Sequence, residues 1–140
     1  MNGNLSETKT LANLQAAFTE ECQCSFVYRY LAEKADKEGY PRAAAALRKV
    51  ADDEAKHAMG HLRYLGKVEL PHLCVGLGYT EDNLNSAVAT ENYQSQGLYP
   101  TMSKEAREEG FDEIADWFDK LAKAEQALAS ELLESLESIG

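Results

Sequence analysis

The chain has 140 residues, with 14 Lys and Arg against 24 Asp and Glu, which gives a formal net charge of −10 at pH 7. A chain this acidic is repelled by phosphate backbones and by anionic lipid, so nucleic acid and membrane surfaces are not expected partners. Its three cysteines form no Cys-x-x-Cys pair, which excludes a four-cysteine zinc site within one chain. The length fits a single domain over residues 1–140. Without an apolar signal core or spanning segment, we expect it in the cytoplasm.

Four segments carry apolar residues at helical spacing, and none shows the alternation typical of a strand. Gly39 ends the first helix and Pro41 lies in the first turn of the second. Thr80 is the expected N-cap of the third helix, and the fourth follows Gly110. The expected helices cover residues from about 5 to 38, from 41 to about 65, from about 80 to Gly110, and from there onward.

The connections between these helices predict how they are arranged. The first and third connections are very short, which makes the helices that they join antiparallel neighbours. The second connection is longer, about residues 66–79, and contains Gly, Pro and aromatic residues. The sequence therefore predicts an all-α fold, an antiparallel four-helix bundle with one long crossover between the second and third helices.

The two halves of the chain resemble each other. Residues 35–40 match residues 106–111 at an offset of 71, whereas earlier in the chain an offset of 70 pairs Glu21 with Glu91. One extra residue between Glu91 and Tyr99 accounts for this slip. We therefore expect a single-turn π-bulge there, a feature that often occurs at functional sites.

Each helix has one glutamate within its apolar stripe, and the four lie at similar distances from the short helix connections: Glu21, Glu54, Glu91 and Glu125. Any one of them could be a surface residue, and a strict offset of 71 would favour Glu20 over Glu21. Four at matched depth nevertheless indicate a common site. A buried charge without compensation costs several kcal/mol, against roughly 5–15 kcal/mol for a whole fold.

Two divalent cations would neutralise these four carboxylates. His57 follows Glu54 by three residues, and a Glu-x-x-His pair on a bundle helix is a ligand motif of di-iron proteins. Carboxylate with imidazole suits iron or manganese. The sequence therefore predicts a metal centre in the middle of the bundle.

The chain resembles the rubrerythrins, which belong to the ferritin-like superfamily, over nearly its whole length. The resemblance implies a ferritin-like bundle, usually a homodimer, with a non-haem di-iron centre that reduces hydrogen peroxide to water and protects against oxidative stress. The matching segments are residues 13–21, Tyr28, 38–40, 54–58, 91–93, 99–100, 108–118 and 121–125.

Carried over residue by residue, the resemblance implies two irons per chain, with manganese or zinc as other possible metals. Glu54 and Glu125 would bridge the metals. Glu21 and His57 would bind the first metal, and Glu91 the second.

Further roles and departures follow from the same resemblance. Tyr28 and Tyr99 would donate hydrogen bonds to ligating carboxylates. Leu128 stands where the second metal's imidazole is expected, and Gln94 replaces a second glutamate, although its amide oxygen can still coordinate. The Cys-x-x-Cys pairs of the family's rubredoxin domain do not occur here, so electrons would come from a separate protein such as a rubredoxin.

Three functions stay open at this point. The first is peroxide reduction at a di-iron centre, with an impaired second site. The second is a degenerate relative that binds one or two metals without efficient turnover, as a sensor, store or structural module. The third, an oxygen-activating oxidase, would need an apolar access channel.

Two further residues near the expected site have alternative interpretations. His61 is either a satisfied core histidine or part of the polar network, where it could bind an off-centre metal. Cys24 is either a small buried residue or a thiol that borders the site as a soft ligand or redox partner.

Overall fold

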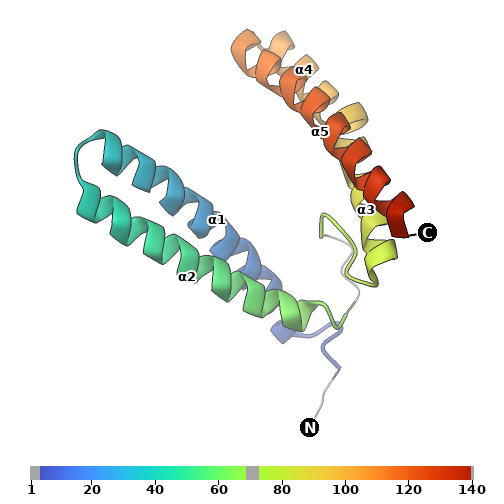
Figure 1. The fold of residues 1–140 in the computed structure, drawn as a ribbon, viewed down its shortest axis with the longest axis horizontal. Helices are drawn as coiled ribbons and strands as arrows, with labels where there is room; N and C mark the ends of the chain where they lie inside the picture. Colours follow the sequence, from blue (N-terminus) through green and yellow to red (C-terminus); the bar gives the residue numbers. More distant parts are fainter. Residues whose placement is uncertain (1–3, 69–72, 140) are drawn as a thin grey trace. The chain divides into compact units, whose positions relative to one another are not determined.

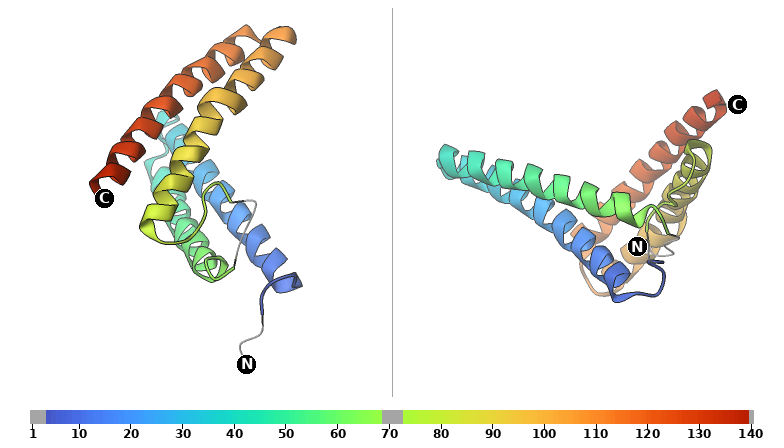
Figure 2. Two further views of the ribbon diagram at one scale, coloured as in Figure 1. Left: turned by 90° about the vertical axis from the view of Figure 1, so that its right-hand side faces the viewer. Right: turned by 90° about the horizontal axis from the view of Figure 1, so that it is seen from below.

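The computed structural model describes residues 4–68 and 73–139 (Figure 1). The described residues form helices and no strand, which confirms the all-α prediction. The chain divides into two compact units, residues 1–69 and 70–140, and each is an antiparallel helical hairpin (Figures 1 and 2). Part of the expected crossover, residues 69–72, lies outside the described residues. No helix in the described ranges is long and apolar enough to cross a membrane.

The first hairpin consists of α1 (Lys9–Lys37) and α2 (Pro41–Leu65). Helix α1 begins later than the apolar pattern predicts because Thr8 caps it. The Thr8 hydroxyl accepts a hydrogen bond from the Leu11 amide at 3.1 Å and so satisfies one of the free donors of the first turn. Helix α2 has the predicted bounds, with proline at its start.

Small residues let α1 and α2 approach closely. Ala32, Ala35 and Ala44 form a buried cluster against which Leu47 packs. Deeper along the pair, the buried Ser25 hydroxyl donates a 2.8 Å hydrogen bond to the Ala51 carbonyl. This bond joins the two helices directly and satisfies a polar group that would otherwise be costly to bury.

The second hairpin pairs one long, interrupted helix with α5 (Asp112–Ile139). The interrupted helix consists of α3 (Thr80–Tyr93), the π-helical turn η1 (Gln94–Leu98) and α4 (Tyr99–Glu108). The η1 turn confirms the predicted π-bulge.

Hydrogen bonding explains where the π-helical turn falls. The Tyr99 amide donates to the Gln94 carbonyl, five residues back rather than four. The next residue, Pro100, has no amide proton, so the normal α-helical ladder is already broken at this point. The extra residue is therefore accommodated where the helix loses the fewest backbone hydrogen bonds.

The start of α3 differs from the prediction. Thr80 is the first helical residue, and the N-cap is Tyr79, whose side chain makes no capping hydrogen bond. Asn83 fixes this end instead. Its side chain accepts from the Gly78 amide at 2.6 Å and donates to the Gly78 carbonyl at 2.8 Å, so an internal residue of the first turn ties the loop to the helix.

The internal repeat is reproduced in the geometry of the two hairpin turns. Gly39 and Gly110 have φ values of 86° and 88°, in the left-handed region that favours glycine. The hydrogen bond that closes each turn is 2.8 Å long in both hairpins: Tyr40 amide to Ala35 carbonyl, and Phe111 amide to Ala106 carbonyl. Two sequence-related segments therefore make the same turn.

An ion pair beside each turn is repeated with its charges exchanged. In the first hairpin Arg48 lies 2.8 Å from Asp36. In the second, Arg107 occupies the position of Asp36 and lies 3.0 Å from Asp119, which occupies the position of Arg48. Within each hairpin opposite charges meet, whereas exchanging helices between hairpins at these positions would bring like charges together.

Candidate metal centre

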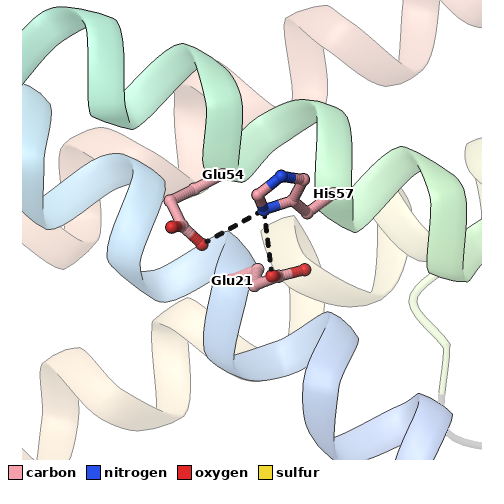
Figure 3. A group of neighbouring side chains, drawn as sticks. All are labelled: Glu21, Glu54 and His57. Atoms are coloured by element: carbon pink, nitrogen blue, oxygen red, sulfur yellow. Dashed lines mark ion pairs between the residues drawn. The ribbon is translucent and has the colours of Figure 1, made fainter.

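A carboxylate–imidazole cluster lies between α1 and α2 (Figure 3). Glu21 comes from α1, and Glu54 and His57 lie one turn apart on the facing side of α2. His57 Nδ1 is 3.3 Å from Glu21 Oε1 and 3.9 Å from Glu54 Oε2. One potential ligand atom from each residue lies within 4.8 Å of the others, so the predicted Glu-x-x-His motif meets Glu21 as expected.

The environment of these side chains favours a cation. Glu21 and Glu54 retain 21% and 25% of their side-chain exposure, so both carboxylates are largely covered. Glu21 Oε2 is buried and accepts no hydrogen bond from any described residue. A buried carboxylate oxygen without a partner is costly, and a bound cation would remove that cost.

A second histidine contacts the same carboxylate. His61 Nε2 lies 2.6 Å from Glu21 Oε2, although the pair does not have the alignment of a hydrogen bond. His61 is therefore part of the polar cluster rather than an isolated core residue. The signal in the sequence was its position four residues after His57, which places both imidazoles on one face of α2.

Cys24 borders this cluster. Burial raises the pKa of its thiol, and the carboxylates of Glu20, Glu54 and Glu21 raise it further. The negative charges disfavour a thiolate. Cys24 therefore stays a neutral thiol near neutral pH. The thiolate is the form that binds metal, so Cys24 is a weaker candidate ligand than the neighbouring carboxylates.

The second hairpin contributes the other two predicted glutamates, Glu91 from α3 and Glu125 from α5. A hydrogen bond with the Glu125 side chain, together with burial and the Glu125 charge, raises the pKa of Glu91 to about 7. Glu91 Oε2 is buried, and no described residue donates a hydrogen bond to it. Two carboxyl groups that share a site in this way hold a proton that a cation could replace.

Two further positions of the predicted second metal site lie in this hairpin, one on each of its two helical arms. Gln94 is the first residue of η1, one turn beyond Glu91. Leu128 lies one turn beyond Glu125 with 43% of its surface exposed, and it brings no nitrogen donor. The carboxylate pair therefore has only oxygen donors beside it at the positions that the sequence identified.

The two tyrosines of the predicted site are half-buried, Tyr28 on α1 and Tyr99 at the start of α4. The Tyr99 ring stacks on Phe118 with the ring centroids 6.0 Å apart. Within the described ranges neither hydroxyl donates a hydrogen bond to a carboxylate. Their expected role toward ligating carboxylates stays a prediction.

Comparison with known proteins places these residues in a family. The chain matches the rubrerythrin family model over residues 12–133, and it belongs to the rubrerythrin family. It is 36% identical to rubrerythrin from Porphyromonas gingivalis over 129 residues, covering 89% of this chain and 64% of that protein. It is 32% identical to rubrerythrin from Clostridium perfringens over 145 residues, covering 97% of this chain and 74% of that protein.

The chain therefore matches only part of these two relatives, 64% and 74% of their lengths. A solved structure of nigerythrin in a mixed-valence state is similar, with a TM-score of 0.45 and 26% identity, over 99% of this chain and 70% of that one. Family membership implies the ferritin-like helical fold and non-haem iron. The donors of Glu21, Glu54 and His57 are of the types that iron accepts.

Proposed function

We propose that the chain is a non-haem di-iron protein that reduces hydrogen peroxide to water, with electrons from an external donor protein such as a rubredoxin. The observation that carries the proposal is the Glu21, Glu54 and His57 cluster in a chain of the rubrerythrin family. Its biological role would be protection against peroxide in the cytoplasm.

The proposal assigns each carboxylate a role. The two hairpins would form one four-helix bundle in which Glu54 and Glu125 are shared by both metals. Glu21 and His57 would complete the first position. Glu91 would complete the second, with the neutral amide oxygen of Gln94 available as a weak donor.

When bound, the two irons supply the electrons that reduce peroxide. The protein side chains balance charge and position donors. Four carboxylates offset the four positive charges of two ferrous ions, so the loaded site is neutral in a poorly solvated interior. Tyr28 would hold a ligating carboxylate in place through its hydroxyl group.

Association with a second copy is part of the proposal. Large apolar side chains are exposed on each hairpin, including Phe26 at 72% and Trp117 at 54%. Burying such surface is the main driving force for association, so we propose a homodimer. Light scattering on the purified protein tests this, and a monomer mass would contradict it.

The alternative function is a metal-binding module without efficient turnover. Leu128 favours this alternative, because a metal beside Glu91 and Glu125 would lack an imidazole. Losing a directly bound ligand weakens a metal site more than losing an outer partner, and the outer partner alone is worth about 10–100-fold in affinity. The two functions differ in metal content and in turnover.

The deciding experiment loads the protein with ferrous iron without oxygen, removes the excess and measures iron per chain. Peroxide consumption is then followed with a reduced rubredoxin as electron donor. We expect about two irons per chain and steady turnover. Glu54→Gln and Glu125→Gln should each abolish turnover, whereas Glu20→Gln, an exposed neighbour of Glu21, should keep it.

One iron or fewer per chain, with no peroxide reduction by any electron donor, would contradict the di-iron proposal and support the metal-binding module. Turnover that survives Glu125→Gln would contradict the assignment of a shared carboxylate from the second hairpin.

A further inference from the structure

We propose that His61 is a metal ligand, and that His57, His61 and Glu21 form a three-donor site for one divalent transition metal within the first hairpin. This inference rests on the metal-binding part of the proposed function and not on peroxide turnover. Both imidazole ligands of this site would come from α2, whereas α5 has Leu128 at the position where the family resemblance predicts an imidazole.

The first argument is spacing. His57 and His61 are separated by four residues in the continuous helix α2, so they lie on the same face one turn apart. Two histidines at this spacing on a helix can bind one metal ion together, as in the zinc-binding His-Glu-x-x-His motif. Between them this helix has only Ala58, Met59 and Gly60, none of which carries a charge that would compete for the imidazoles.

The second argument is the position of Glu21 between the two rings. Its Oε1 lies 3.3 Å from His57 Nδ1, and its Oε2 lies 2.6 Å from His61 Nε2. Each carboxylate oxygen therefore faces one imidazole nitrogen. A third donor supplied by the opposite helix is what closes a His₂–carboxylate site, a donor set common for zinc and ferrous iron.

The third argument is the unusual contact between His61 and Glu21. The two atoms are close enough for a strong hydrogen bond, yet Glu21 Oε2 is buried and accepts none from the described residues. Two ligands of one metal have this relation, because their lone pairs point at the ion rather than at each other. With bonds of about 2.0–2.2 Å, such ligand atoms lie roughly 3 Å apart.

In this structure Glu21 and His57 group with Glu54 rather than with His61, so one imidazole ring has to turn before the three donors surround one ion. The side chain of His57 is 57% exposed, so its ring can turn without displacing buried neighbours. The side chain of His61 is more covered, at 29% exposure, and already touches the buried oxygen. Glu54 remains within reach of His57 as a fourth donor, and none of these residues comes from the second hairpin.

The test uses the full chain and Co²⁺, whose visible absorption changes on binding and gives a Kd. For the tightest site we expect His61→Gln to raise the Kd at least about 10-fold, since a directly bound ligand is worth more than an outer one. His57→Gln should do the same. The exposed controls Glu20→Gln in the first hairpin and Glu134→Gln in the second should leave this Kd within about two-fold.

A second measurement separates a ligand from a residue that only positions Glu21. X-ray absorption of the chain loaded with one equivalent of Zn²⁺ should show scattering from two imidazole rings, reduced to one in His61→Gln. Three results would overturn the inference: one imidazole in the unsubstituted chain, an unchanged Kd in His61→Gln, or equal weakening by the exposed control Glu20→Gln and by His61→Gln.

Failure of this inference can be told apart from failure of the proposed function. A chain that binds one Co²⁺ with two imidazoles but reduces no peroxide keeps the His57–His61–Glu21 site and loses the peroxidase proposal. A chain that binds two irons and turns over peroxide, with the same metal affinity in His61→Gln, keeps the peroxidase proposal and loses this site.

Discussion

At the scale of single residues, the buried carboxylates show most directly that this fold is shaped for a ligand. Glu21 and Glu91 each have a buried oxygen that lacks a hydrogen-bond partner among the described residues. Neither contributes to a packed apolar core, and each opposes folding while it is charged and unpaired. Their persistence in the interior of two short hairpins is explained if a cation or a proton compensates them.

The raised pKa of Glu91 predicts how the stability of the metal-free protein depends on pH. Folding raises the pKa of Glu91 to about 7 from its ordinary value of 4.5. Between these values the folded state binds more protons than the unfolded state, so stability falls as pH rises through this window and levels off above it. Urea unfolding of metal-free protein at about pH 5 and about pH 7.5 measures this fall.

Glu91→Gln removes the titrating group, so the fall in stability should become smaller in this variant. Glu134→Gln, an exposed substitution in the same unit, serves as the control and should keep it. An equal fall in the Glu91→Gln variant would contradict the coupling between Glu91 and Glu125.

At the scale of elements, the two hairpin turns are the clearest product of the internal repeat. Both place a glycine at positive φ one residue beyond the C-cap of a helix and close with the same hydrogen bond. The geometry is a requirement on the backbone, because no atom lies within 4 Å of where a Cβ would be added at Gly39 or Gly110. The glycines are thus needed for conformation and not for space.

This distinction predicts opposite effects for three glycine substitutions. Gly39→Ala and Gly110→Ala should each destabilise the protein by about 1–2 kcal/mol, the cost of a left-handed conformation with a side chain. Gly60→Ala, in the interior of α2 with equally open space, should stabilise it by about 0.5–1 kcal/mol, because alanine favours a helix. Urea unfolding of the metal-free variants gives all three values. A stabilising Gly39→Ala would show that the turn tolerates another conformation.

The exchanged ion pairs are a second property of the elements. Asp36–Arg48 and Arg107–Asp119 are exposed, and each such pair contributes no more than about 1 kcal/mol. These pairs also select which helices associate. The hairpins in Figure 1 bring opposite charges together, whereas pairing α1 with α5 or α2 with α4 would bring like charges together.

At the scale of the whole molecule, a net charge of −10 and several largely covered carboxylates make the metal-free chain self-repelling. Divalent cations bound where the folded hairpins bring these donors together would reduce that repulsion. Under the proposed function metal binding is coupled to folding, and removing the metal should destabilise the protein.

This coupling predicts a thermal shift. Zn²⁺ at about 100 times its Kd should stabilise the folded chain by about 2.7 kcal/mol, which corresponds to a rise in Tm of roughly 5–15 °C for a chain of this size. A chelator should reverse the rise. Differential scanning calorimetry with and without Zn²⁺ measures it.

The matched variants for this prediction are neighbours on α1. Glu21→Gln should lose most of the rise in Tm, whereas Glu20→Gln should keep it, which also decides between the two glutamates that the repeat left open. A full shift in Glu21→Gln would place the metal outside the α1–α2 cluster.

The sequence by itself determined the helical class, the bounds of α2, the π-helical turn after Glu91 and the meeting of Glu21 with Glu54 and His57. These features follow from local spacing, which a helix converts directly into position. The capping of α3 by Asn83 and the contact of His61 with Glu21 were decided only by the tertiary structure. Both depend on the rotation and approach of partners that periodicity does not specify, namely a loop carbonyl in one case and the facing helix in the other.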